Sequence, residues 1–260
     1  MTIKQVKKLN KFNIPNNAIY IYGNHPAKSA LLSSNRSCYL LCTTEKKFDY
    51  WNNFVISNKI NIKIVLLETF ELNNISNSNH QGIVVFASKI IKKKLSEYLK
   101  KLSSKKTRIL ILDQLTDPQN VGSIIRSAFA FNFDAVCLLK NNSPIETSSL
   151  IKASAGGIDN IQILEIGNLV QEISILKKQN FFIYGLDGEG KIKIQEIDKA
   201  DNRIALIIGA EGKGLRRLTK ENCDLLVSIA NNNDSDFNTL NVSVSSALAL
   251  YEFMGSEINN

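Results

Sequence analysis

Ile204-Ala-Leu-Ile-Ile208-Gly209-Ala-Glu-Gly-Lys-Gly-Leu215 is the stretch that decides the fold. A continuous apolar run leads directly into a turn that is rich in glycine. Runs of this kind are typical of strands in a parallel sheet that is covered on both faces, and similar runs occur at Arg108–Leu112 and Leu225–Ile229. The stretch therefore predicts an α/β domain with a ligand beyond the carboxyl end of this strand, where ligands of such sheets bind.

Short apolar runs alternate with longer amphipathic segments through the second half of the chain. The apolar runs predict strands at Arg108–Leu112, Ala135–Leu139, Ile161–Glu165, Phe181–Tyr184, Ile204–Ile208 and Leu225–Ile229. The other segments predict helices at Val121–Phe131, Ser148–Ala155, Leu169–Lys178, Leu215–Leu218 and Leu240–Phe253. Because this alternation is typical of βαβ units, residues 108–260 are predicted to form one α/β domain.

A second, smaller α/β domain is predicted over residues 15–88. Its expected strands are Ile19–Tyr22, Cys38–Cys42, Ile64–Leu67 and Gly82–Phe86, with a helix near Pro26–Leu32 and a loop at Asn73–Asn79. Residues 89–107 combine many lysines with apolar residues at helical spacing, which predicts a basic amphipathic helix and linker. For most of these lysines a solvated connector is the simpler interpretation.

The charge of the chain is unevenly distributed. The 260 residues carry a net charge of +8. Residues 1–107 hold 18 Lys and Arg against 5 Asp and Glu, whereas residues 108–260 hold 14 against 19. A basic front half would attract a polyanion such as nucleic acid by counterion release and long-range steering. A lysine-rich composition that serves solubility explains the same charge equally well.

The composition excludes several classes of protein. With 44 % hydrophobic and 22 % charged residues, the chain is neither disordered nor fibrous. No apolar run reaches the roughly 18 residues of a membrane span, and the first residues lack the apolar segment of a secretion signal. Four cysteines and two histidines cannot build a disulfide scaffold or a zinc cluster. We therefore expect no metal, no membrane partner and a reducing, cytoplasmic location.

The first of three polar loops follows the strand at Arg108–Leu112. It contains Asp117-Pro118, which indicates a turn, and Asn120, which we expect to cap the next helix. A helix N-terminus favours anions, and Arg126 lies between one and two turns further on, where it could fork onto a phosphate. The alternative is that Asn120 is only a cap and Arg126 only a surface charge.

Two further loops carry unusual residues. In Gly209–Leu215 the glycine spacing matches neither the dinucleotide fingerprint nor the P-loop, and Glu211 would repel a triphosphate. A small ligand that is approached by bare backbone groups fits better, although a tight strand-to-helix turn explains the glycines too. The third loop, Thr239–Leu248, predicts a close-packed helix start that Asn241 caps.

These three segments resemble, in order, spacing and position, the motifs of the SpoU (TrmH) family of RNA ribose methyltransferases. The matching stretches are Asn120–Arg126, Gly209–Gly212 and Leu240–Val244. In the front half, Ile21–His25 and His80–Ile83 resemble the start and end of the small ribosomal-protein-like substrate-binding domain of this family. Within the family, the pattern is most similar to the type that methylates guanosine 2′-hydroxyls of large-subunit (23S) rRNA.

The resemblance implies a trefoil-knot (SPOUT) methyltransferase domain, an exception to the rule that chains are unknotted. It also implies S-adenosylmethionine as the cofactor, RNA, here rRNA, as the partner, and a homodimer as the active unit. It places cofactor contacts at Leu186, Gly188, Ile208, Gly209, Ile229 and Leu240. It assigns catalytic or pocket-shaping roles to Arg126, Asn120, Glu211, Asn241 and Ser243.

The family arginine that corresponds to Arg126 is proposed as a base or as a phosphate clamp that acts across the dimer interface. We favour the clamp, because a guanidinium rarely loses its proton in proteins. The chain departs from the family at Ile229-Ala-Asn231, where Ile-Pro-Met is usual, at the longer polar stretch Asn231–Asn238, and at Thr239, where Ser is usual.

Two other functions remain open at this point. The chain could methylate a tRNA ribose, although the front domain favours rRNA because many tRNA-acting relatives use short terminal extensions instead. It could also be a catalytically inactive scaffold that binds RNA through its basic front domain. The intact Arg126, Glu211 and Asn241 argue against such a scaffold.

Overall fold

The computed structural model describes residues 9, 11–76, 79–141, 143–144, 146–197, 202–229 and 240–254. The chain forms two compact units. Unit 1 comprises Met1–Ile91 and Glu146–Asn160, and unit 2 comprises Lys92–Ile145 and Ile161–Asn260. This differs from the expected division at 15–88, 89–107 and 108–260, because Glu146–Asn160 belongs with the front of the chain.

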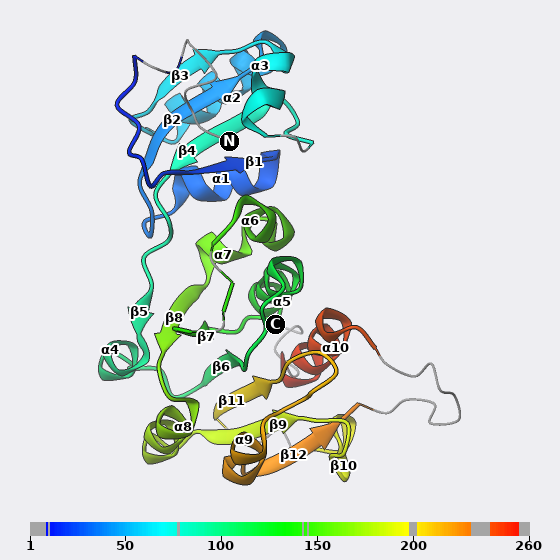
Figure 1. Ribbon diagram of the computed structural model, residues 1–260. Helices are drawn as coiled ribbons and strands as arrows, with labels where there is room; N and C mark the ends of the chain where they lie inside the picture. The colour runs from blue at the N-terminus through cyan, green and yellow to red at the C-terminus, as the bar shows by residue number, and fades with distance from the viewer. Residues whose placement is uncertain are drawn as a thin grey trace. The chain divides into compact units, whose positions relative to one another are not determined.

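Unit 2 is built on an eight-stranded sheet with the order β10-β12-β9-β11-β6-β7-β8-β5 (Figure 1). Its strands are β5 (Lys93–Lys94), β6 (Thr107–Leu112), β7 (Ala135–Leu139), β8 (Gln162–Ile166), β9 (Phe182–Leu186), β10 (Ile192–Lys193), β11 (Arg203–Ile208) and β12 (Leu225–Ser228). Every neighbouring pair runs parallel. The predicted α/β class and the six predicted strands are confirmed, with ends that shift by one or two residues.

Helices cover both faces of this sheet, which is why its strands are continuously apolar. The helices are α4 (Leu95–Lys100), α5 (Pro118–Ala130), α8 (Leu169–Lys178), α9 (Arg217–Asn222) and α10 (Val242–Met254), with a 3-10 turn at Ile194–Glu196. Leu169, Ile173 and Leu176 of α8 share a core cluster with Ile183 of β9. Phe253 of α10 packs on Tyr184, which points to the opposite face. Helix α5 lies beside α10.

Two helices of unit 2 differ from expectation. The helix expected at Leu215–Leu218 begins at Arg217, because Leu215 is buried in the core and Arg216 has an extended backbone. The basic helix expected within 89–107 covers only Leu95–Lys100, after the two-residue strand β5. That strand pairs with β8, so part of the expected linker belongs to the sheet.

Unit 1 contains a four-stranded sheet with the order β1-β4-β2-β3. Its elements are β1 (Ile19–Tyr22), α1 (Asn24–Leu32), β2 (Cys38–Thr43), α2 (Glu45–Ser57), β3 (Lys63–Leu66), α3 (Thr69–Ile75), β4 (Ile83–Ala87), α6 (Ser148–Ser154) and α7 (Gly157–Asn160). The four predicted strands are confirmed. The predicted loop at Asn73–Asn79 is wrong at its start, because the capping box of Glu68 and Glu71 begins a helix that reaches Ile75. Residues 77 and 78 lie outside the described part.

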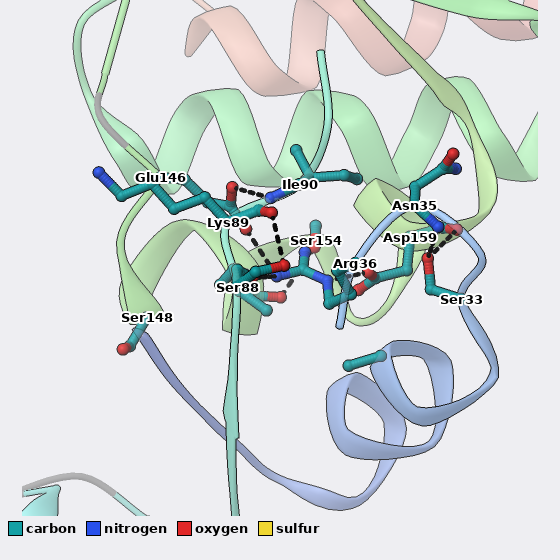
Figure 2. Close-up of polar contacts among 12 residues, drawn as sticks. Ser33, Asn35, Arg36, Ser88, Lys89, Ile90, Glu146, Ser148, Ser154 and Asp159 are labelled. Atoms are coloured by element: carbon teal, nitrogen blue, oxygen red, sulfur yellow. Dashed lines mark hydrogen bonds and ion pairs between the residues drawn. The ribbon is translucent and has the colours of Figure 1, made fainter. Parts of the chain in front are cut away.

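A buried ion triad ties Glu146–Asn160 into unit 1. Figure 2 shows the Arg36 guanidinium between the carboxylates of Asp159 and Glu146. Its Nε donates to Asp159 over 2.5 Å and its Nη1 lies 2.8 Å from Glu146. Burial lowers the pKa of Arg36, but the charges of Asp159 and Glu146 outweigh it and leave that pKa raised. The arginine therefore stays charged, and Glu146 also accepts a hydrogen bond from the Ile90 backbone.

The four cysteines are free thiols with little tendency to ionise. Burial raises the pKa of Cys38 to about 11 and the pKa values of Cys42 and Cys223 to about 12. Cys137 is fully buried and its pKa is also raised.

None of the helices in the described part of the chain has the length and apolar character needed to cross a bilayer. The described residues also hold no group of His, Cys, Asp or Glu side chains suited to a metal ion.

The ion triad predicts a large loss of stability when its cation is removed. Arg36→Met leaves two carboxylates buried without their cation, so we expect unit 1 to lose about 3–5 kcal/mol of unfolding free energy. Trp51 is the single tryptophan of the chain and is buried in the core of unit 1. Its fluorescence during urea unfolding therefore reports on this unit.

Arg217→Met is a suitable control for this measurement. It removes the exposed pair with Glu221 on α9 and should leave the Trp51 transition where it is. An Arg36→Met transition that coincides with that of the unchanged protein would show that the triad does not hold the two segments of unit 1 together.

Candidate functional site

A cavity of about 480 Å³ lies at the carboxyl edge of the sheet of unit 2. It is lined by the turn after β9, the loop after β11 and the segment that leads into α10. All six residues expected to contact a cofactor line it: Leu186, Gly188, Ile208, Gly209, Ile229 and Leu240. Neighbouring parallel strands end at the same edge, and this is why residues so far apart in the sequence gather there.

The glycine-rich loop is folded tightly against itself. The Gly214 N–H donates to the Ala210 carbonyl over 2.9 Å. A Cβ atom at Gly209 would lie 2.2 Å from the Gly214 carbonyl oxygen, so no larger residue fits at this position without moving the loop. Gly212 and Gly214 have φ angles of +74° and +61°, which favour glycine. The loop therefore presents backbone groups to the cavity, as the sequence predicts.

Four of the five expected catalytic residues form one polar network. The Asn120 amide donates to Glu211 over 3.5 Å, and its Oδ1 accepts from Asn241 over 3.3 Å. The Ser243 hydroxyl lies 3.4 Å from the same Asn120 oxygen and also contacts Asn241. The three motifs thus meet through their side chains next to the glycine loop. Asn241 caps α10 as expected, because it accepts from the Ser243 N–H over 2.9 Å.

The expectation that Asn120 caps α5 is wrong. The cap is Asp117, whose carboxylate accepts from the backbone N–H groups of Gln119 and Asn120. Pro118 occupies the first turn, where its fixed φ and missing N–H suit a helix start. Since the helix begins before Asn120, the side chain of this residue is free to join the network.

Arg126 does not join this network. It is exposed on α5 and has no hydrogen-bond or ion-pair partner among the residues that the structure describes. It follows Asn120 by six positions, which places it about 120° around the helix and about 9 Å along it. Within the part of the chain that the structure describes, the guanidinium is therefore available to an incoming group.

Two acidic residues that sequence reasoning did not single out stabilise the site. Asp113 follows β6 directly, is buried, and accepts from Arg216 over 3.1 Å and from Thr219 over 3.1 Å. Asp187 follows β9 directly and lies 3.0 Å from Lys220. Their signal in the sequence is an acidic residue immediately after an apolar strand, although its basic partner lies far along the chain.

The charged lining of the cavity is more acidic than basic. Asp187, Glu189 and Glu211 face it, together with Lys213 and Lys220. Hydrogen bonds to Glu189 and Asp187 raise the pKa of Lys220, so this side chain stays cationic. Together with apolar residues such as Leu186 and Ile208, this lining suits a small ligand that has an apolar part and a positive charge.

Comparisons with known proteins show the family of this chain. The profile of the SpoU rRNA Methylase family matches residues 107–251. The 23S rRNA (guanosine-2′-O-)-methyltransferase RlmB of Coxiella burnetii is 35 % identical over 236 residues, which cover 89 % of this chain and 93 % of the relative. An uncharacterized tRNA/rRNA methyltransferase of Borreliella burgdorferi is 35 % identical over 204 residues, 74 % of this chain and 87 % of the relative.

Solved structures show the same fold. The SpoU methyltransferase AviRb of Streptomyces viridochromogenes, crystallised with the cofactor AdoMet, aligns with a TM-score of 0.75 at 18 % identity. The alignment covers 94 % of this chain and 92 % of AviRb. The family profile spans all the loops that build the cavity and its polar network, and the two relatives extend the likeness beyond it, so this chain belongs to the SpoU rRNA methylase family.

Proposed function

We propose that this chain transfers a methyl group from S-adenosylmethionine to the 2′-hydroxyl of a ribose, that of a guanosine in 23S rRNA. The observation that carries the proposal is that all six expected cofactor residues line one and the same cavity, with the Asn120 network beside it. The 35 % identical relative from Coxiella burnetii supports the choice of nucleoside and RNA.

The cavity suits S-adenosylmethionine in its volume and in the charge of its lining. The adenine and methionine parts would lie against the backbone of the Leu186–Glu189 turn and the Ile208–Gly214 loop. The cofactor supplies a methyl group that is activated on a positively charged sulfur. Asp187, Glu189 and Glu211 give the lining an acidic character that suits this charge.

The chemistry requires the protein to position a weak nucleophile. A ribose hydroxyl must lie in line with the methyl group and lose its proton. Asn120, Asn241 and Ser243 offer amide and hydroxyl groups that can hold the ribose, and Glu211 orients Asn120. Arg126 binds a phosphate next to the target ribose, since the planar fork of a guanidinium matches the geometry of phosphate oxygens.

RNA binding involves the basic front of the chain. Residues 1–107 carry 18 Lys and Arg against 5 Asp and Glu, which attracts a polyanion. We assign to this region the role of the family's ribosomal-protein-like substrate-binding domain. The functional division into a substrate-binding region at 15–88, a linker at 89–107 and a methyltransferase region at 108–260 remains a proposal, with Glu146–Asn160 moved to the front unit. A cytoplasmic location is also a proposal, which the four free thiols support.

A homodimer and a trefoil knot complete the proposal. Val244, Leu248 and Tyr251 form an exposed apolar stripe along α10, and Phe129 is exposed on the neighbouring α5. A second copy would cover these side chains and bring its own Arg126 near the partner's cofactor cavity.

The proposed trefoil knot is supported by the cavity lining, since Leu240 lies beside the loops that follow β9 and β11. The unusual stretch at 230–239 lies outside the described residues.

The proposed function is tested by binding and methyl transfer. We expect saturable binding of S-adenosylmethionine in calorimetry, followed by transfer of its labelled methyl group to 23S rRNA fragments. Alkaline hydrolysis then locates the modified ribose, because a 2′-O-methyl group blocks cleavage of the adjacent phosphodiester. Transfer to tRNA alone would favour the tRNA enzyme, and a folded protein that does not bind the cofactor would favour the inactive scaffold.

Arg126→Ala should abolish turnover and weaken cofactor binding only modestly, because the side chain has no contact with the cavity.

A complementation experiment tests the action of Arg126 across the dimer. Gly209→Ala should block the cofactor site, since its Cβ has no space. An equal mixture of the two variants should regain roughly a quarter of the normal rate, from the one intact site in each mixed dimer. Normal turnover of Arg126→Ala alone would contradict the proposed mechanism.

Leu248→Glu should convert the protein to monomers and remove activity, because it places a charge in the proposed apolar interface. Light scattering after gel filtration gives the mass directly. Ile175→Glu on α8 is the matched control, since it alters an exposed apolar residue on another helix and should leave the mass unchanged. A Leu248→Glu protein with the same mass as the unchanged chain would exclude this surface as the interface.

A further inference from the structure

The turn that follows β9 is held in shape by several hydrogen bonds. The Asp187 carbonyl accepts from the Gly190 N–H over 3.0 Å, and the Asp187 carboxylate accepts from the Glu189 N–H over 3.0 Å. The Ser228 hydroxyl donates a hydrogen bond of 2.8 Å to the Gly190 carbonyl. A Cβ atom at Gly190 would lie 2.6 Å from the Val227 carbonyl carbon, so the end of the turn packs directly on β12.

This turn concentrates negative charge beside the cavity. Asp187 and Glu189 stand on either side of Gly188, and all three residues line the cavity. The Asp187 side chain is almost fully buried, whereas the Glu189 side chain is exposed. Two like charges this close repel each other, and a buried carboxylate is costly without a partner. A cation between the two carboxylates offsets this cost.

Lys220 of α9 provides that cation. Its ammonium lies 3.0 Å from Asp187 and 2.9 Å from Glu189, so one group bridges both carboxylates. The lysine comes from a different element, which follows the glycine loop. It thereby connects the Leu186–Gly190 turn to α9, the helix that follows the Gly209–Leu215 loop.

We propose that Lys220 is a positioning residue for the cofactor: by bridging Asp187 and Glu189 it holds Leu186 and Gly188 where S-adenosylmethionine binds. The proposal rests on the proposed function for the identity of the ligand. Lys220 does not take part in methyl transfer. Its loss should therefore change the affinity for the cofactor and leave the chemical step intact.

Lys220→Met tests this role, because it keeps much of the side-chain length and removes the charge. We expect the dissociation constant for S-adenosylmethionine to rise about tenfold in calorimetry, the scale of one lost partner to a buried carboxylate. The turnover number with saturating cofactor should stay within about twofold of normal, since the Asn120 network and Arg126 are untouched. Lys220→Arg should restore most of the affinity, because it returns the charge.

Arg217→Met is the matched control. It removes a cation from the same helix, but Arg217 pairs with Glu221 and does not line the cavity. Cofactor affinity should not change in this variant. An unchanged affinity in Lys220→Met, or an equal loss in both variants, would overturn the proposal.

Hydrogen exchange of the ligand-free protein separates this proposal from the proposed function. The Glu189 and Gly190 amides donate within the turn, so they should exchange faster in Lys220→Met and at the normal rate in Arg217→Met. If the unchanged protein does not bind S-adenosylmethionine but the exchange result holds, the proposed function fails and Lys220 still orders the turn. Unchanged exchange would show that Lys220 does not hold the turn.

Discussion

The parallel direction of three adjacent strands is the constraint on which the site depends. Strands β9, β11 and β6 are neighbours and end at one edge of the sheet. Whatever follows each strand is therefore brought to the same place, however distant it is in the sequence. The glycine loop after β11 then has the turn after β9 on one side and the first motif after β6 on the other. The cavity and the polar network beside it lie together because these three segments share an edge.

Burial and charge act differently in the two units. In unit 1 the Arg36 triad is almost completely removed from water, and its main effect is to join two segments that are far apart in the chain. In unit 2 the pairs of Arg216 with Asp113 and of Lys220 with Asp187 are partly exposed on the cationic side. Such pairs contribute less to global stability, but they determine the local shape of loops that receive a ligand.

Much of the fold could be predicted from apolar periodicity, because continuous apolar runs such as Ile204–Ile208 have few other interpretations. The start of α5 at Pro118 could also be predicted from the sequence, since proline is common at the first position of a helix and aspartate is a common cap. The expectation that Asn120 caps this helix did not use that signal. Ion pairs between residues that are far apart in the chain could not be predicted from the sequence. Arg36 and Asp159 are 123 positions apart, and no local pattern links them. The residues of the cavity were found through family resemblance rather than through spacing.

Helix α9 has a consequence for how this region of the chain can vary. Arg216 and Lys220 are one helical turn apart, and they pair with acidic residues that follow the two strands flanking β11. Insertion of a single residue between them would rotate one by about 100° relative to the other, so only one of the two pairs could form. The segment therefore tolerates changes of side chain more readily than changes of length. Helical phase, rather than residue identity alone, is the property that this part of the sequence must preserve.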